Sequence, residues 1–132
     1  MVWCRIIGPA LAILALALLQ ACSAVKLAYN NTPELAYWWI DGYADLDVAQ
    51  PGTVREELAR LHQWHRRTEL PKIAELLQKA RQMAVADATP EQACKLFADI
   101  RIRIDAVILQ AEPASVALTM DLSAAQLAHM ES

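Results

Sequence analysis

Apolar residues recur every three or four positions along most of the chain after residue 32, which is the spacing of one face of an α-helix. Short alternations such as IRIRID at 100–105 lie inside this longer helical period, so they do not indicate strands. The pattern predicts helices over 33–46, 54–70, 72–86, 90–111 and 114–120, and a short final helix from residue 124. We therefore expect an all-α fold, either a small antiparallel helical bundle or a hairpin array.

Helix starts and breaks in the sequence support these boundaries. Three residue pairs fit the capping box, in which a hydroxyl and a side chain three residues later satisfy free backbone amides of the first turn: Thr53 with Glu56, Thr89 with Gln92, and Ser123 with Gln126. Predicted breaks fall at Gln50-Pro51-Gly52, Leu70-Pro71 and Glu112-Pro113. Pro71 leaves two alternatives, a break or only a kink in a continuous helix. Asp87-Ala88 is expected to reverse the chain.

The first 22 residues have a different pattern. Every residue over 6–19 is apolar, glycine or proline, and Arg5 is the only charge before them. This run is too short for a bilayer span and typical of a signal peptide. Its end, LLQACS, resembles a bacterial lipobox with Cys22 as the lipidated residue. We expect residues 1–21 to be a lipoprotein signal peptide and residues 22–132 a helical periplasmic domain; an ordinary secretory signal or a short membrane anchor is the alternative.

The lipobox resemblance implies a location and a partner. A lipid, including a palmitate-type acyl chain, on Cys22 would attach the protein to the bacterial cell envelope membrane. Ser23 rather than aspartate after this cysteine favours the outer membrane, with the protein facing the periplasm. Cys94 would then be the one free thiol, and we expect it to be a small buried apolar residue. With 15 acidic and 12 basic residues and no basic patch, the sequence argues against a nucleic-acid partner.

The segment LHQWHRRTELP, residues 61–71, gathers candidate chemistry. His62 and His65 are three positions apart, whereas zinc proteases need histidines at i and i+4 with a glutamate between them. His65 lies in the apolar stripe, so we interpret it as a helix-interface histidine whose hydrogen bond is accepted by Glu69. The alternative is a metal-dependent or hydrolytic enzyme using His62, His65 and Glu69. No nucleophile accompanies them in the sequence, so we predict no catalytic residue, metal or cofactor.

The segment YNNTPELAYWWIDGYADLD, residues 29–47, combines aromatic and acidic side chains. Trp38 and Trp39 fall in the stripe expected to face the bundle, although tryptophan also favours membrane interfaces. Asp41 and Asp45 repel each other at i,i+4 unless a cation pairs with them, and we take two consecutive arginines as the candidate cations. We predict that Arg66 or Arg67 pairs with one of these aspartates. The combined structural or interaction motif contains Trp38, Trp39, Asp41, Asp45, Trp64, His65, Arg66, Arg67 and Glu69.

These two segments, together with TPEQACKLF and LSAAQLAHM, resemble a family of uncharacterised bacterial lipoproteins that share a domain of unknown function. Members of that family are longer and have a further helical half, so the resemblance implies a chain truncated at its C-terminus. The family implies no activity. A looser similarity, in ATPEQ and LSAAQ, joins the chain to Spy-type periplasmic helical proteins with LTxxQ motifs. The leading hypothesis is a non-enzymatic envelope protein with a protein-binding, chaperone-like or structural role; its oligomeric state is not predicted.

Overall fold

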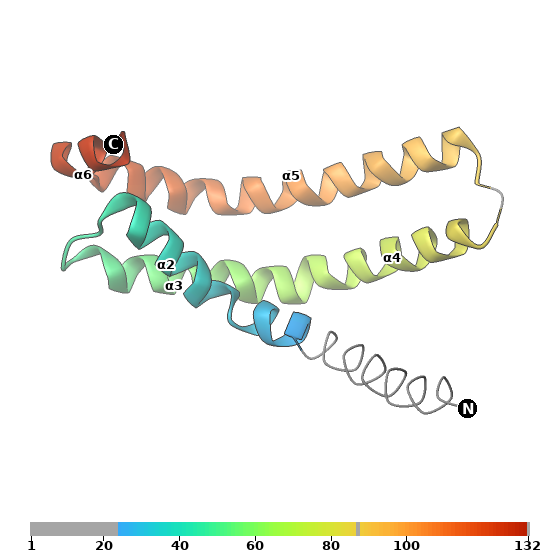
Figure 1. Cartoon of the computed structure of the whole chain (residues 1–132), viewed down its shortest axis with the longest axis horizontal. Coiled ribbons are helices and arrows are strands. Elements are labelled where there is room, and N and C mark those ends of the chain that lie inside the picture. Colours follow the sequence, from blue (N-terminus) through green and yellow to red (C-terminus); the bar gives the residue numbers. More distant parts are fainter. Residues whose placement is uncertain (1–23, 87, 132) are drawn as a thin grey trace, which may run out of the picture.

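The computed structural model describes residues 24–86 and 88–131, and every regular element within these ranges is a helix (Figure 1). The predicted all-α class is confirmed. Residues 24–30 are helical, and the elements that follow are α2 (Thr32–Ala44), α3 (Gln50–Trp64), the π-helix η1 (His65–Glu69), α4 (Leu70–Ala84), α5 (Pro90–Asp121) and α6 (Ala124–Met130).

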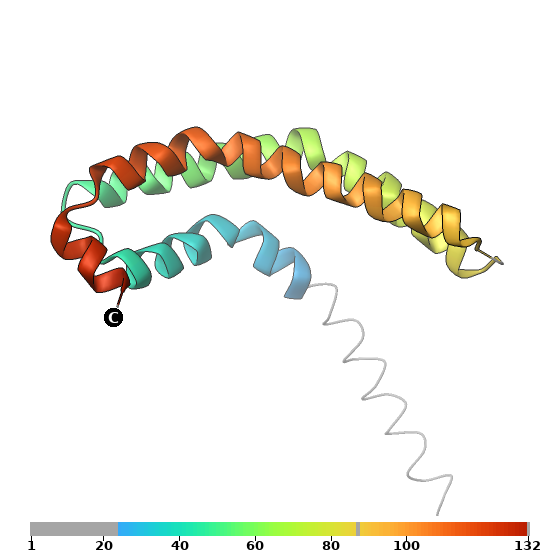
Figure 2. The ribbon, with the colours of Figure 1, turned by 90° about the horizontal axis from the view of Figure 1, so that it is seen from above.

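The molecule is an elongated helical hairpin. α3, η1 and α4 follow one another as a single long rod, and α5 runs back beside this rod along its whole length (Figures 1 and 2). α2 crosses one side of α3, and α6 turns over the end of α5 to meet α2. The predicted reversal between 86 and 90 is confirmed, although residue 87 itself lies outside the described residues. The predicted hairpin is therefore present, with a second layer only at the α3 end.

Two of the three predicted capping boxes are formed. The Thr89 hydroxyl accepts from the Gln92 amide at 3.3 Å, and Ser123 does the same for Gln126 at 3.3 Å. The prediction for Thr53 is wrong, because α3 begins at Gln50 and Thr53 already lies in its first turn. Pro51 explains the earlier start, since a proline at the beginning of a helix lacks only an N–H that would have no partner there.

The two internal prolines do not break their helices. Pro71 has no N–H, so it cannot donate the usual helical hydrogen bond to the carbonyl four residues before it. Next to it, the Leu70 N–H reaches the carbonyl of His65, five residues back, which makes the π-helical turn η1. The kink alternative is thus the correct one here. The predicted break at Pro113 is wrong: α5 continues through it, because a proline removes one backbone hydrogen bond and a long packed helix retains the others.

The small core lies where α2 covers α3. Its buried apolar residues are Tyr37, Ala44 and Val54, while α4 and α5 have no buried residue. The predicted inward orientation of Trp38 and Trp39 is wrong, since they are 67% and 71% exposed. The helical period explains the error: α2 is apolar on two sides, and the side that carries Tyr37 and Ala44 is the one that packs.

Candidate functional site

The π-helix places one carboxylate in the middle of the hairpin. Glu69 is the last residue of η1 and is only 1% exposed. Its two carboxylate oxygens accept from Lys72 Nζ at 2.7 Å and from Arg103 Nη1 of α5 at 3.2 Å. A buried carboxylate needs such partners, because an unpaired charge away from water is costly. Glu69 therefore links the rod to α5 at the level of the helix irregularity.

The charge state of Glu69 follows from these partners. The hydrogen bond from Lys72 holds the pKa of the Glu69 carboxyl below its ordinary value of 4.5, against the opposing effect of burial. The positive charges of Lys72 and Arg103 lower the pKa further. Glu69 is therefore ionised at neutral pH. Such a group acts as a fixed ionic link and lacks the raised pKa that a carboxyl needs to donate a proton near neutral pH.

Both histidines of the motif bind the helix that precedes α2. His62 donates from Nε2 to the backbone carbonyl of Tyr29 at 3.0 Å. A hydrogen bond of 2.9 Å joins His65 Nδ1 and the Tyr29 hydroxyl, and the Tyr29 ring lies 4.8 Å from the His62 ring and 5.9 Å from the His65 ring, centroid to centroid. The two histidines thus attach residues 24–30 to the rod.

Several contacts predicted from the sequence are not made. The predicted hydrogen bond from His65 to Glu69 is not formed, so that prediction is wrong. His65 instead bonds to Tyr29, and Glu69 bonds to a side chain of α5. The predicted ion pairs of Arg66 or Arg67 with Asp41 or Asp45 are also absent from the described residues, where both arginines are exposed.

The physical reason for the missing ion pairs is the direction of α2. α2 and α3 run in opposite directions, so the C-terminal, acidic end of α2 lies beside the start of α3. The two arginines follow the other end of α3, a whole helix away. A different cation packs on α2: Arg55 lies over the Tyr37 ring at 3.5 Å and pairs with Glu34 at 3.5 Å.

A second polar cluster lies at the open end of the hairpin, opposite the turn between α4 and α5. Gln50 Nε2 donates to the backbone carbonyl and to the carboxylate of Asp121, at 3.1 and 3.2 Å. Gln126 Nε2 donates to Gln50 Oε1 at 2.7 Å and to the Asp45 carbonyl at 3.0 Å. Both glutamines are buried and fully bonded. We call this the glutamine junction. Gln126 could be found in the sequence only as a capping residue, and Gln50 only as part of a break.

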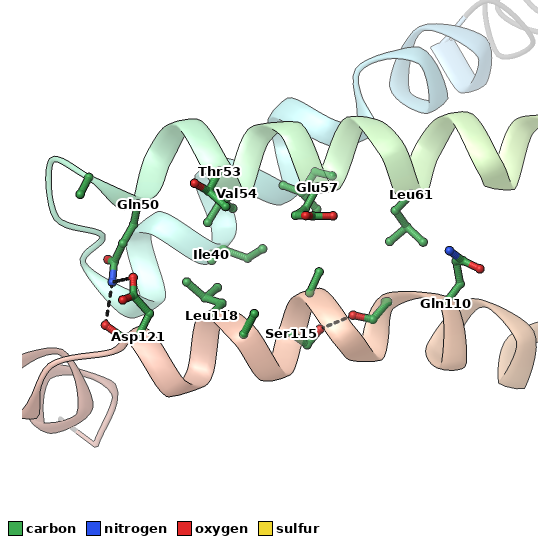
Figure 3. Close-up of a pocket in the computed structure, with 15 residues that line it drawn as sticks. Ile40, Gln50, Thr53, Val54, Glu57, Leu61, Gln110, Ser115, Leu118 and Asp121 are labelled. Carbon is green, nitrogen blue, oxygen red and sulfur yellow. Dashed lines mark hydrogen bonds between the residues drawn. The ribbon is translucent and has the colours of Figure 1, made fainter.

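A groove of about 400 Å³ runs between α3 and α5 next to this junction (Figure 3). Its walls are mainly apolar, and the side chains of Ile40, Leu61 and Leu118 point into it. Alanines and a serine form much of the α5 wall: Ala111, Ala114, Ser115 and Ala117. These short side chains leave the space between the two helices open. Two carboxylates, Glu57 and Asp121, also line it, and each has a structural partner: Glu57 pairs with Arg60, and Asp121 accepts from Gln50. The groove therefore resembles an incompletely filled core more than a reaction site.

The described residues contain no group of three or more histidine, cysteine, aspartate or glutamate side chains placed to hold a metal ion. Within the same ranges no helix is long and apolar enough to cross a bilayer. The prediction that Cys94 is buried is wrong, because this thiol on α5 is exposed. The predicted signal peptide and Cys22 lie outside the described residues, so both stay predictions.

Comparison with known proteins assigns the chain to a family. The model of a family of unknown function (DUF6279) matches residues 42–132, more than half of the chain. The chain belongs to this family. The match includes Gln50, Glu69 and Gln126, and it begins after the two exposed tryptophans of α2. No curated protein and no solved structure matches the chain.

Proposed function

We propose that this member of the DUF6279 family is a non-enzymatic helical module that binds another protein through α5. In this proposal Cys22 carries the lipid that anchors the module to the outer membrane, facing the periplasm. The single observation that carries the binding role is a row of exposed apolar side chains along α5, directly beside the face that packs on the rod. This row, which we call the α5 ridge, consists of Phe97, Ile100, Ile104 and Ile108.

The α5 ridge is unusually exposed for side chains of this kind. Phe97, Ile104 and Ile108 are 71%, 54% and 60% exposed. Single exposed apolar residues are ordinary on a protein surface, but a contiguous row of large ones indicates an interaction site. α4 and α5 have no buried residue, so the part of the hairpin that these two helices form has no core of its own. A partner that covers the ridge would supply one.

The geometry of the ridge favours a helical partner. Its residues are spaced by three, four and four positions, so they form a straight row along α5. A row at this spacing packs into the groove of another helix, as the core positions of a helical bundle do. Two helices form only half of such a bundle core. We therefore expect the partner to offer an amphipathic helix or helical hairpin.

The enzyme alternative has less support. His62 and His65 both contact Tyr29, and Glu69 is buried between two cations. Each of the three groups thus has a structural partner, and no hydrogen bond of the described residues joins Glu69 to either histidine. A hydrolytic site needs a nucleophile or an activated water within reach of its base and an electrophilic stabiliser. These contacts favour structural roles for the three residues.

Thiol labelling can test whether the α5 ridge is covered in the envelope. In a Cys94→Ser background, the Ile104→Cys variant should react several-fold more slowly with a polar maleimide in intact envelopes than after purification, because a partner would shield it. Gln78→Cys, on the exposed side of α4, is the matched control and should react equally in both samples. Equal rates for Ile104→Cys would contradict the proposal. Protection that persists in the purified chain would instead assign the ridge to a second copy.

A further inference from the structure

The outer side of α2 carries a surface that the proposed function does not use. Its large side chains are Leu35, Trp38, Trp39 and Tyr43, and all four are exposed. We call this surface the α2 aromatic face. The rings of Trp39 and Tyr43 stack, with their centroids 5.7 Å apart and an angle of 5° between their planes. This stack lies at the surface, outside the small core, so no other part of the described chain covers the face.

The aromatic face is free of charge. On a helix with 3.6 residues per turn, its four residues and Gly42 occupy one continuous arc, and the acidic residues of α2 lie beside this arc. Glu34, at one edge, is paired with Arg55. The opposite side of α2 holds Tyr37 and Ala44 against α3. α2 therefore has one apolar side in the protein and another that faces outward.

The residue types on this face match one environment well. Tryptophan and tyrosine combine an apolar ring with a polar N–H or O–H, and they concentrate where a bilayer meets water. A helix with such an apolar face lies in the plane of the interface. The acidic residues beside the face argue against strong attraction to anionic lipids. The face thus suits a zwitterionic phospholipid surface.

The chain path would bring this face close to a membrane. An extended chain spans at most about 3.6 Å per residue, so Ala24 stays within about 7 Å of the Cys22 Cα atom. Residues 24–30 lead into α2 on the same side of the layer formed by α3 and α5 (Figure 2). His62 and His65 fix this segment through Tyr29. A lipid on Cys22 would therefore hold α2 beside the bilayer surface.

We propose that the α2 aromatic face rests in the interfacial layer of the membrane to which Cys22 anchors the chain. The inference rests on the anchoring part of the proposed function and adds to it a fixed orientation of the chain on the membrane. With α2 on the lipid, the α3–α5 layer lies above the membrane. The α5 ridge then remains available to a protein partner.

Tryptophan quenching by brominated lipid tests this inference in the full chain. The chain has four tryptophans, and Trp3→Phe in every variant removes the one in the leader. Adding Trp64→Phe leaves Trp38 and Trp39 as reporters, whereas Trp38→Phe with Trp39→Phe leaves the half-buried Trp64 of α3 as the matched control. Each protein is reconstituted in phosphatidylcholine vesicles with bromine near the headgroup end or near the tail end of the acyl chains.

The expected result is a loss of at least about half of the Trp38 and Trp39 fluorescence, greater with bromine near the headgroup end. Trp64 should lose much less. Unquenched Trp38 and Trp39 emission in vesicle-bound protein would overturn the inference. A blue-shifted emission without quenching would also overturn it, because it means that protein covers the face.

Anchoring and docking can fail separately, and the design distinguishes them. The mass of the same sample reports whether Cys22 carries lipid. If Cys22 is unmodified, the proposed anchoring fails, and the chain is then held at the vesicle by coupling Cys22 to a maleimide lipid in a background with Cys4→Ser and Cys94→Ser. Quenching of Trp38 and Trp39 in this tethered protein supports docking of the aromatic face, and its absence contradicts docking.

Discussion

The Gln126→Ala substitution is expected to lower the free energy of unfolding by about 2–4 kcal/mol, since it removes three hydrogen bonds that each contribute about 0.5–1.5 kcal/mol. The Gln126 side chain donates to Gln50 and to the Asp45 carbonyl, and it accepts from the Ser123 amide. Truncation leaves the buried Gln50 oxygen and the Asp45 carbonyl with fewer partners. It also frees the α6 end of the hairpin from α2, so the loss should be cooperative.

Gln92 provides a matched control for this prediction. Gln92 has the same capping-box role at the start of α5, where its Oε1 accepts from the Thr89 amide at 3.0 Å, but it is exposed and bonds nothing on another element. Gln92→Ala should therefore cost only about 0.5–1 kcal/mol. Urea unfolding followed by circular dichroism measures both values. Equal costs would mean that the glutamine junction contributes nothing beyond capping, and a cycle with Gln50→Ala should show coupling between the two glutamines.

Replacing Glu69 with glutamine is expected to lower the melting temperature at pH 7 by several degrees and to change how stability depends on acid. The pKa of Glu69 lies below its ordinary 4.5, first because of the hydrogen bond from Lys72. The unfolded chain therefore binds this proton more readily than the folded chain does. Its contribution to stability is fully present above about pH 4.5 and is lost as the pH falls through the folded-state pKa.

Thermal melts of the wild type and the Glu69→Gln variant between about pH 7 and pH 3 measure this effect. The difference between the two proteins should be greatest near neutrality and should shrink below about pH 4.5. Glu91 also has a lowered pKa, held by hydrogen bonds from its own backbone amide and from Thr89, but it is present in both proteins and cancels. Glu75→Gln, at an exposed position of α4, is the control. A constant difference across the pH range would exclude the ionic link to Lys72 and Arg103.

Local signals in the sequence were sufficient to predict that these segments are helical and to place several of the helix ends. Thr89 and Ser123 could be placed because a capping box is completed within four residues. The effect of Pro113 could not be predicted in the same way, because it depends on what packs along α5 on both sides of the proline. Pro71 is accompanied by a π-helical turn. The two alternatives drawn from the sequence, a break or a kink, did not include this kind of irregularity.

The candidate site was predicted less well because its contacts join distant segments. The helical period shows that α2 has an apolar stripe, but it does not show which of two apolar sides packs on α3; Trp38 and Trp39 were therefore placed inward. Glu69 was recognised as a partner residue, but one of its two cations, Arg103, lies 34 positions away on α5. The glutamine junction spans 76 positions between Gln50 and Gln126. No local pattern can predict which of many polar residues meet across such separations.

Attachment to the membrane through Cys22 places the proposed binding module in the envelope and underlies the proposed position of α2. Mass spectrometry of the full-length gene product, recovered from the membrane fraction of a bacterial host, tests this attachment most directly. The expected result is a chain that begins at Cys22 and carries acyl chains on this residue, with a Cys22→Ala variant that carries no lipid and is not cleaved before residue 22. An unmodified Cys22, or a Cys22→Ala chain that is processed and retained as the wild type is, would contradict it.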